Sequence, residues 1–331
     1  MRRALELAQR GKLHVSPNPM VGCVIVYEDR IIGEGYHTAY GQSHAEVNAI
    51  NSVKNKELLS KSTLYLTLEP CSHYGKTPPC ADLLIQYNIP QIYVAVSDPN
   101  PKVAGKGIEK LKASGCKVEV GLLEKQAREL NKRFFCYHQN QRPYIILKWA
   151  QTLDGYMDCN TRDCQDRKPY WITNDLLRIK THQWRAEEDA IFVGANTLIH
   201  DNPQLNVRYC AGKNPIRVTF ATRDINPNLH FFDNTQQSIV FNYEREEKTD
   251  KLHFCKLSKE ENYVEAIVKQ LYNMNIQSVL IEGGEHTLQS FLKTNLWDEA
   301  RVLIGNKCFG KGLHAPTIPF APSQIDDFEG G

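Results

Sequence analysis

The chain has 331 residues and a formal net charge of +2, with 40 Lys and Arg against 38 Asp and Glu. This length suits two domains, since single hydrophobic cores usually stop growing at about 100 to 200 residues. The charges form no basic stripe, which disfavours a nucleic-acid substrate and favours a small phosphorylated one. No run approaches the roughly 18 apolar residues of a membrane-spanning helix, so we expect a soluble protein without a membrane partner.

The ten cysteines are scattered along a long chain, and no apolar signal segment precedes them. This pattern predicts reduced thiols and a cytoplasmic location rather than a secreted disulfide framework. Cys159 and Cys164 are close enough to suggest a second metal pair, but no further ligand is evident nearby. We therefore interpret them as ordinary thiols.

Helical and strand patterns alternate through the first half of the chain, which indicates an α/β unit. The expected helices span 2–10, 45–53, 79–87, 108–114 and 124–138, and the expected strands span 23–27, 31–35, 63–68, 91–96 and 116–120.

The short polar segment Gln139–Pro143 marks the expected domain boundary, giving domains of residues 1–141 and 142–331. The second half again alternates and is predicted to be α/β. Its expected strands span 144–150, 189–194, 216–221, 238–242, 277–282 and 300–305, with helices at 174–185, 261–273 and 286–293.

A candidate zinc site is formed by His44, Cys71 and Cys80. One imidazole and two thiolates hold three corners of a zinc tetrahedron, and an open fourth corner for water distinguishes catalytic from structural sites. Glu46 is then a spare carboxylate. The sequence order of His, Glu and the two cysteines matches zinc-dependent nucleobase deaminases, in which this Glu is the general acid/base and not a zinc ligand. The alternative is a structural zinc knuckle or unconnected cysteines.

Glu46 is the expected proton carrier. Bound zinc lowers the pKa of its water from about 15.7 toward about 7, and one carboxylate can carry protons to a ring nitrogen and to a departing amine. Glu46 lies near the start of the helix predicted over 45–53, where unpaired N–H groups favour negative charge. We therefore expect Glu46 to be ionised before catalysis.

Eight residues separate the two cysteines, and Pro-Cys-Ser-His-x-Gly-x-Thr-Pro-Pro-Cys over 70–80 resembles the bifunctional riboflavin-biosynthesis deaminase/reductase family. The resemblance implies a cytidine-deaminase-like three-layer fold and gives His73 no zinc role, so we interpret it as a substrate-side or loop-fixing residue. It also favours substrate contact for Asn18 over an ordinary proline turn. Asp98, Asn100 and Lys102 follow a strand end and are either ligand contacts or a solvated turn.

Five motifs in the second half resemble the reductase half of the same family and imply a dihydrofolate-reductase-like fold that binds NADPH. Alone, the Gly-Gly turn after 277–282 is weak evidence, because such turns are usually just tight. The motifs are Thr152–Gly155, Trp171–Thr173, Val193–Thr197, Asp201–Arg208 and Glu282–Gly284.

The resemblance also implies which residues line the reductase site. Two arginines, Arg185 and Arg208, suit a sugar phosphate, because the planar guanidinium group matches the phosphate oxygens. Lys148 and Asp201 are candidates for the polar groups nearest the hydride-accepting carbon, with purely structural roles as the alternative. The implied cofactor residues are Ala150, Trp171, Thr197, Asp201, Thr222 and Gly284, and the implied substrate residues are Lys148, Arg185, Leu205, Arg208 and Glu282.

Two departures from the family pattern stand out. The segment 156–170 is polar where the family has small residues, which puts a substrate contact at Pro169 in doubt. The chain also ends earlier than family members that finish with another strand. We expect either a truncated sequence or a missing last strand, with an unpaired sheet edge as the result.

The sequence therefore predicts a two-domain enzyme of riboflavin biosynthesis, expected to be a homo-oligomer. One domain would hydrolyse the amino group of 2,5-diamino-6-(5-phosphoribosylamino)pyrimidin-4-one, and the other would use NADPH to reduce the ribosyl chain to ribityl. Two alternatives remain. One is a nucleic-acid deaminase, and the other is a deaminase whose C-terminal domain only binds or dimerises.

Overall fold

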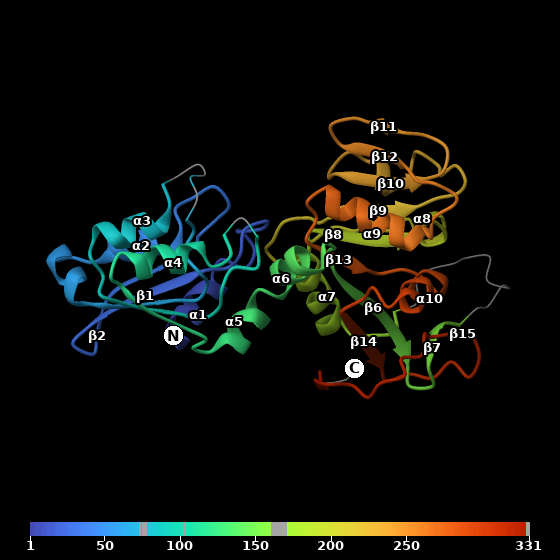
Figure 1. Ribbon diagram of the computed structural model, residues 1–331. Helices are drawn as coiled ribbons and strands as arrows, with labels where there is room; N and C mark the ends of the chain where they lie inside the picture. Colours follow the sequence, from blue (N-terminus) through green and yellow to red (C-terminus); the bar gives the residue numbers. More distant parts are fainter. Residues whose placement is uncertain (73, 75–77, 102, 160–170, 329–331) are drawn as a thin grey trace. The chain divides into compact units, whose positions relative to one another are not determined.

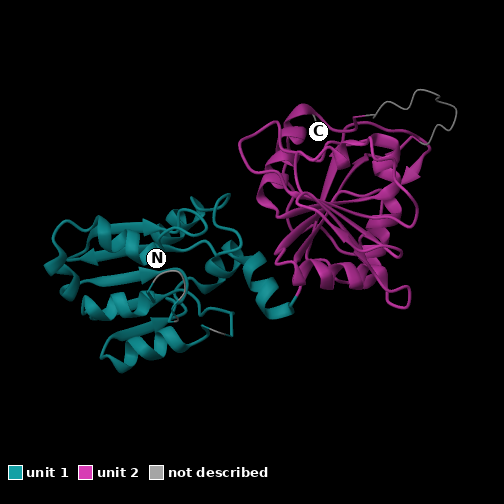
Figure 2. Ribbon diagram, turned by 90° about the horizontal axis from the view of Figure 1, so that it is seen from above, with its two compact units in different colours: residues 1–141 teal, residues 142–331 magenta. Residues whose placement is uncertain are grey.

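The computed structural model describes residues 1–72, 74, 78–101, 103–159 and 171–328 (Figure 1). The chain forms two compact units, residues 1–141 and 142–331 (Figure 2). The expectations for His73, Lys102, Cys164 and Pro169 lie outside the described residues. No helix in the described part of the chain is long and apolar enough to cross a membrane.

The first unit is built on a five-stranded sheet in the order β2-β1-β3-β4-β5. β1 runs antiparallel to β2 and β3, whereas β3, β4 and β5 are parallel. The strands are β1 (Gly22–Tyr27), β2 (Arg30–Tyr36), β3 (Thr63–Leu66), β4 (Gln91–Val94) and β5 (Lys117–Val120).

Helices cover both faces of this sheet because successive strand residues point to opposite sides. Cys23 and Ile25 pack with Ala49 of one helix, whereas Val24 packs with Leu7 of another. The expected three-layer fold is confirmed. The helices are α1 (Arg2–Gln9), α2 (Ala45–Ser52), α3 (Cys80–Gln86), α4 (Lys106–Ala113), α5 (Glu124–Leu130) and α6 (Lys132–Asn140), with a 3-10 turn at Lys56–Lys61.

α2 lies directly against the backbone of β2, and this contact requires glycine. A Cβ on Gly35 would lie 2.2 Å from the Ala49 nitrogen and 2.5 Å from the Ala45 oxygen. Any larger residue would push the helix away from the strand. The contact therefore fixes the start of α2, where His44 and Glu46 lie.

The single helix predicted over 124–138 was wrong, because it is interrupted at Asn131. The buried Asn131 side chain accepts a hydrogen bond from the Met20 N–H at 2.8 Å and donates one to the Met20 carbonyl at 2.9 Å. Side chains of this kind compete with helical hydrogen bonding. The break ties the second helix segment to the loop that contains Asn18.

The second unit is built on an eight-stranded sheet in the order β11-β12-β10-β9-β8-β13-β6-β14, in which only β11 is antiparallel. Among the described strands, β14 forms one edge. The strands are β6 (Tyr144–Thr152), β8 (Ala190–Gly194), β9 (Ile216–Phe220), β10 (Ser238–Asn242), β11 (Glu247–Lys248), β12 (Leu252–Lys256), β13 (Ser278–Ile281) and β14 (Glu299–Gly305).

The central strands of this sheet are apolar on both faces, as parallel strands between helices must be. Phe192 packs toward α9 and α10, whereas Ile191 and Val193 pack with Leu198 of α8. The expected dihydrofolate-reductase-like fold is confirmed. The helices are α7 (Asp175–Glu187), α8 (Ala195–Asp201), α9 (Tyr263–Asn273) and α10 (Glu285–Thr294), with a 3-10 turn at His230–Phe232 and a small ribbon of β7 (Tyr156–Asp158) and β15 (Leu313–His314).

Candidate functional site

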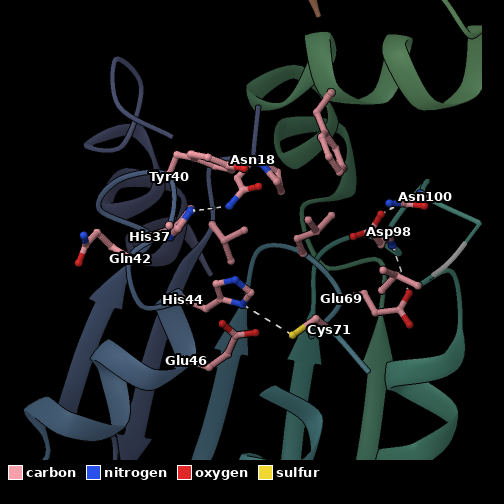
Figure 3. A pocket seen from close by; sticks show the side chains of 16 residues that line it. Asn18, His37, Tyr40, Gln42, His44, Glu46, Glu69, Cys71, Asp98 and Asn100 are labelled. Carbon is pink, nitrogen blue, oxygen red and sulfur yellow. Dashed lines mark hydrogen bonds between the residues drawn. The ribbon is translucent and has the colours of Figure 1, made fainter. Parts of the chain in front are cut away.

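The structure brings together the three predicted zinc ligands, two of which lie at helix starts. His44 directly precedes α2, and Cys80 is the first residue of α3. The His44 Nδ1 lies 3.3 Å from the Cys80 Sγ. It lies 3.6 Å from the Cys71 Sγ, the contact marked in Figure 3. Tetrahedral zinc bonds of about 2.0 Å to nitrogen and 2.3 Å to sulfur separate the ligand atoms by roughly 3.5 Å. These donors therefore fit a zinc ion.

The thiol chemistry of this cluster also suits a metal. A hydrogen bond from the Cys80 thiol, helped by His44 and by the Cys80 N–H, lowers the pKa of Cys71 to about 4. The same bond raises the pKa of Cys80, so the thiol proton of the pair stays on Cys80. Cys71 is thus already a thiolate, which is the form that binds metals.

Glu46 lies beside this cluster and is buried, with 3 % of its surface exposed. Burial, together with the Cys71 thiolate, raises the pKa of Glu46 to about 7. Loss of solvent therefore outweighs the helix dipole here, and Glu46 is part ionised and part protonated near neutral pH. Its ionisation before catalysis stays a prediction. A carboxyl group with a pKa near neutrality can both accept and donate a proton.

A cavity of about 330 Å³ opens onto the cluster and is lined in part by Asn18, His37, His44 and Glu46 (Figure 3). The His37 Nδ1 lies 3.1 Å from the Ser43 carbonyl, which can only accept, so this nitrogen carries the proton. The His37 Nε2 therefore accepts a hydrogen bond from the Asn18 side-chain nitrogen at 3.0 Å. This leaves the Asn18 side-chain oxygen as an acceptor for a ligand.

Glu69 organises the opposite wall and was missed by sequence reasoning, although it directly precedes the Pro-Cys motif. Its carboxylate accepts from the N–H groups of Gly107 at 2.9 Å and Gly105 at 3.0 Å. It also accepts from Asp98 and Ile108 at 3.2 and 3.3 Å. One buried carboxylate thereby joins Asp98 to the start of α4.

Asp98 and Asn100 both line the cavity from this loop. The Asn100 N–H donates to the Asp98 carboxylate at 2.8 Å. Burial raises the pKa of Asp98 to about 6. Of the two interpretations of this segment, the placement supports a ligand contact over a solvated turn.

The second unit has a cavity of about 600 Å³ at the carboxyl ends of β8, β9 and β13, where ligands of parallel sheets collect. It is lined by Thr197, Thr222 and Gly284, three of the predicted cofactor residues. Gly194 and Gly284 precede α8 and α10, so two helix starts face this space. Helix starts bind phosphates through free N–H groups, and a Cβ at Gly284 would meet nothing closer than 3.7 Å. The cavity therefore fits a dinucleotide cofactor.

The other three predicted cofactor residues are not among the described residues that line this cavity. Ala150 lies in β6, and Asp201 ends α8 with its side chain exposed. Trp171 is 51 % exposed, and the Arg178 guanidinium lies 4.4 Å from the centre of its ring.

Three predicted substrate residues form one largely buried cluster of charges, with side chains 9 to 14 % exposed. Arg185 donates two hydrogen bonds of 2.8 Å to Glu282, and the Lys148 Nζ lies 3.7 Å from the same carboxylate. Although burial opposes ionisation, Arg185 and Lys148 lower the pKa of Glu282 to about 2. Burial and the charge of Arg185 lower the pKa of Lys148. Because its fork is occupied by Glu282, Arg185 is less available for a phosphate than the prediction implied.

The remaining substrate candidates differ in exposure. The Leu205 side chain is buried in the core, so only its backbone is available to a ligand. Arg208 is exposed, and its N–H donates to the His182 Nδ1 at 3.2 Å. Burial, together with Arg185 and Arg208, lowers the pKa of His182 to about 4. His182 was missed by sequence reasoning and holds Arg208 in place.

Two family models match the chain. The cytidine and deoxycytidylate deaminase zinc-binding region matches residues 1–96, and the RibD C-terminal domain matches residues 143–324. The riboflavin biosynthesis protein RibD of Aquifex aeolicus is 41 % identical over 325 residues, covering 95 % of this chain and 88 % of the relative. That of Bacillus amyloliquefaciens is 40 % identical and covers 96 % and 86 %.

Solved structures give the same result. A diaminohydroxyphosphoribosylaminopyrimidine deaminase/5-amino-6-(5-phosphoribosylamino)uracil reductase from Thermotoga maritima is 37 % identical, with a TM-score of 0.86 over 99 % of this chain and 95 % of its own. RibD of Acinetobacter baumannii is 34 % identical, with a TM-score of 0.85 over 98 % and 92 %. The resemblance inferred from the motifs is confirmed. The chain belongs to the RibD family of bifunctional riboflavin-biosynthesis enzymes, which join a zinc-dependent deaminase to an NADPH-dependent reductase.

Proposed function

We propose that residues 1–141, the deaminase unit, deaminate diaminohydroxyphosphoribosylaminopyrimidine, and that residues 142–331, the reductase unit, reduce the resulting 5-amino-6-(5-phosphoribosylamino)uracil. The observation that carries this proposal is the cluster of His44, Cys71 and Cys80 with the buried Glu46 beside it. The substrate is inferred from the activity of the related Thermotoga maritima enzyme, and the cavity beside the cluster has space for the substrate ring.

In the deaminase unit, His44, Cys71 and Cys80 would hold the zinc, which supplies Lewis acidity that makes water a nucleophile at neutral pH. Addition of water to the amino-bearing ring carbon requires a proton on the ring nitrogen and later on the departing amine. Glu46 takes one proton from water and delivers it to the ring nitrogen, and it then carries the hydroxyl proton of the adduct to the departing amine. The carbon–nitrogen bond then breaks, and ammonia leaves a carbonyl behind.

Polar groups on both walls of the deaminase cavity hold the substrate ring in position for attack by water. The Asn18 oxygen accepts from a ring or exocyclic N–H group, because its nitrogen is already engaged by His37. Asp98 and Asn100 supply further contacts from the loop that Glu69 holds. Such preorganisation reduces the entropy lost when the ring is positioned for attack.

In the reductase unit, bound NADPH would supply the hydride, and Thr197, Thr222 and Gly284 would hold it with the N–H groups of two helix starts. Opening of the ribosyl ring requires a proton on its oxygen. We assign this proton to the Lys148 Nζ, because burial lowers the pKa of Lys148 and so eases donation. Glu282 keeps Lys148 and Arg185 in place.

Arg208 is our candidate for the substrate phosphate, because its guanidinium is exposed whereas that of Arg185 is occupied by Glu282. Among the described residues, the Arg208 guanidinium contacts the side chains of the neighbouring Asn206 and Tyr209. A guanidinium in this setting can turn its fork toward a phosphate at little cost.

The first alternative is a second unit that only binds or dimerises. A non-catalytic second unit would need neither a cofactor-sized cavity nor the largely buried ion cluster of Lys148, Arg185 and Glu282, so these two features support catalysis. The absence of a nucleic-acid substrate, the homo-oligomeric state and the cytoplasmic location stay predictions. The absence of disulfides among the described cysteines supports the cytoplasmic location.

The proposed function is tested by supplying the purified chain with the diaminopyrimidine phosphate and NADPH. Ammonia release and the fall in nicotinamide absorbance are followed separately. We expect ammonia without NADPH, and NADPH oxidation only after deamination or when the deaminated compound is supplied. Ammonia release without any NADPH oxidation from that compound would instead support a non-catalytic second unit.

A further inference from the structure

A second group of metal-ligating side chains lies in the reductase unit, away from both sets of residues described above. Glu246, His253 and Cys255 place a carboxylate oxygen, a ring nitrogen and a sulfur within 4.8 Å of one another. The ligand atoms of His44, Cys71 and Cys80 also lie within 4.8 Å of one another. None of the three lines the cofactor cavity or belongs to the charge cluster around Glu282.

The strand pairing explains why these side chains meet. His253 and Cys255 are two residues apart on β12, so they point to the same face of the strand. The antiparallel β11 places Glu247 opposite Phe254, which brings Glu246 beside the end of β12. Glu246 accepts from the Lys256 N–H at 2.7 Å and lies 3.0 Å from the His253 Nε2.

The charges around the cluster keep the carboxylate ionised. The hydrogen bond from Lys256, with the ring of His253 and the charge of Lys248, lowers the pKa of Glu246. The guanidinium of Arg245 lies 3.3 Å from the centre of the Phe254 ring, and Phe254 points to the opposite face of β12 from the cluster. Arg245 is thus directed away from the three ligand atoms.

Cys255 does not suit a role as a nucleophile. It is 5 % exposed, and burial together with Glu246 raises the pKa of its thiol to about 11. A neutral, enclosed thiol of this kind is unreactive. Within the described parts of the chain its sulfur has no hydrogen-bond partner. A buried thiol beside an imidazole and an ionised carboxylate suits metal ligation better than covalent chemistry.

We propose that Glu246, His253 and Cys255 bind a divalent cation of the zinc class as a second metal site of this chain. The cation would displace the Cys255 proton to solvent and replace the bond between His253 and Glu246 with a bond to each. Nitrogen and sulfur ligands favour zinc, cobalt or nickel over magnesium and calcium, which prefer oxygen. The exposed side of Glu246 leaves room for water as a fourth ligand.

The experiment counts zinc on the full-length protein. The chain is stripped with a chelator, equilibrated with zinc by dialysis, and measured by mass spectrometry of the metal. We expect one equivalent more than the deaminase centre alone would hold. His253→Gln and Cys255→Ser should each lose only this extra equivalent, whereas Cys210→Ser, a free half-buried cysteine of the same unit, should keep it.

Cobalt(II) gives a second readout. A cobalt-loaded chain should show thiolate-to-cobalt absorption that decreases in Cys255→Ser and is unchanged in Cys210→Ser. Circular dichroism and retention of the deaminase zinc establish that each variant is folded. The proposal is overturned if the wild-type chain binds a single equivalent, or if folded His253→Gln and Cys255→Ser bind as much zinc as the wild type. Neither result depends on the enzymatic activities.

Discussion

Glu46 and Glu282 are both buried carboxyl groups in reaction sites, yet their surroundings give them opposite properties. Glu46 lies beside a thiolate, and burial raises its pKa to about 7. Glu282 is enclosed by Arg185 and Lys148, which lower its pKa to about 2. The first can exchange protons near neutral pH, whereas the second is a fixed anion that positions cations. The neighbours of a carboxylate therefore decide its role.

The largest expected effect comes from Glu46→Gln, which keeps the shape but cannot carry protons. Deamination should fall by about a thousandfold, since general acid–base catalysis contributes on the order of 10² to 10⁴ in rate. Bound zinc and NADPH oxidation with the deaminated compound should be unchanged. Ammonia release at the wild-type rate would show that another group carries the protons.

Glu282→Gln tests the other half of the comparison. It leaves Lys148 and Arg185 buried without their counter-ion, so the unfolding free energy of the reductase unit should fall by about 3 kcal/mol. Reduction should fall and deamination should persist. Urea unfolding measures the first effect, and Glu265→Gln on the exposed face of α9 is the matched control. Equal stability of Glu282→Gln and wild type would contradict a fixed-anion role.

Glu69→Gln addresses a third buried carboxylate, which binds backbone N–H groups instead of protons or cations. Loss of the charge weakens four hydrogen bonds and loosens the loop of Asp98 and Asn100. We expect the KM for deamination to rise about tenfold, in line with hydrogen bonds to charged groups. Steady-state kinetics with zinc analysis checks this, and a loss of zinc with unchanged KM would point to a different role.

The smallest effect concerns pH. The pKa of His182 is lowered to about 4 in the folded chain, against an ordinary value near 6.5. Its contribution to stability is therefore present above about pH 6.5 and is lost as the pH falls toward 4. His182→Asn, which keeps an acceptor for the Arg208 N–H, should flatten this part of the stability curve. Parallel curves for variant and wild type would reject the assignment.

The zinc ligands could be predicted because the chemistry lies in short motifs. Cys71 and Cys80 are only 27 and 36 residues from His44, and Cys71 follows the recognisable strand β3 whereas Cys80 begins a helix. Strand and helix alternation likewise gave most elements, because periodicity is a local property. The pKa of Glu46 was not predicted, since burial depends on the complete fold.

Features built from distant contacts were missed for the same reason. Glu69 reaches amides up to 39 residues away, and Arg185 is joined to Glu282 across 97 residues. Asn131 ends a helix by bonding to Met20, 111 residues earlier, so no local signal marks the break. The short strand β12 was also overlooked, because its Leu252–Lys256 sequence is half polar.

The most direct test of two independent sites on one chain is removal of the metal. A chelator-treated chain should release no ammonia from the diaminopyrimidine phosphate, and added zinc should restore the release. The same chain should still oxidise NADPH when the deaminated phosphoribosylaminouracil is supplied. Undiminished ammonia release without metal, or loss of NADPH oxidation in a folded chelated chain, would contradict this account.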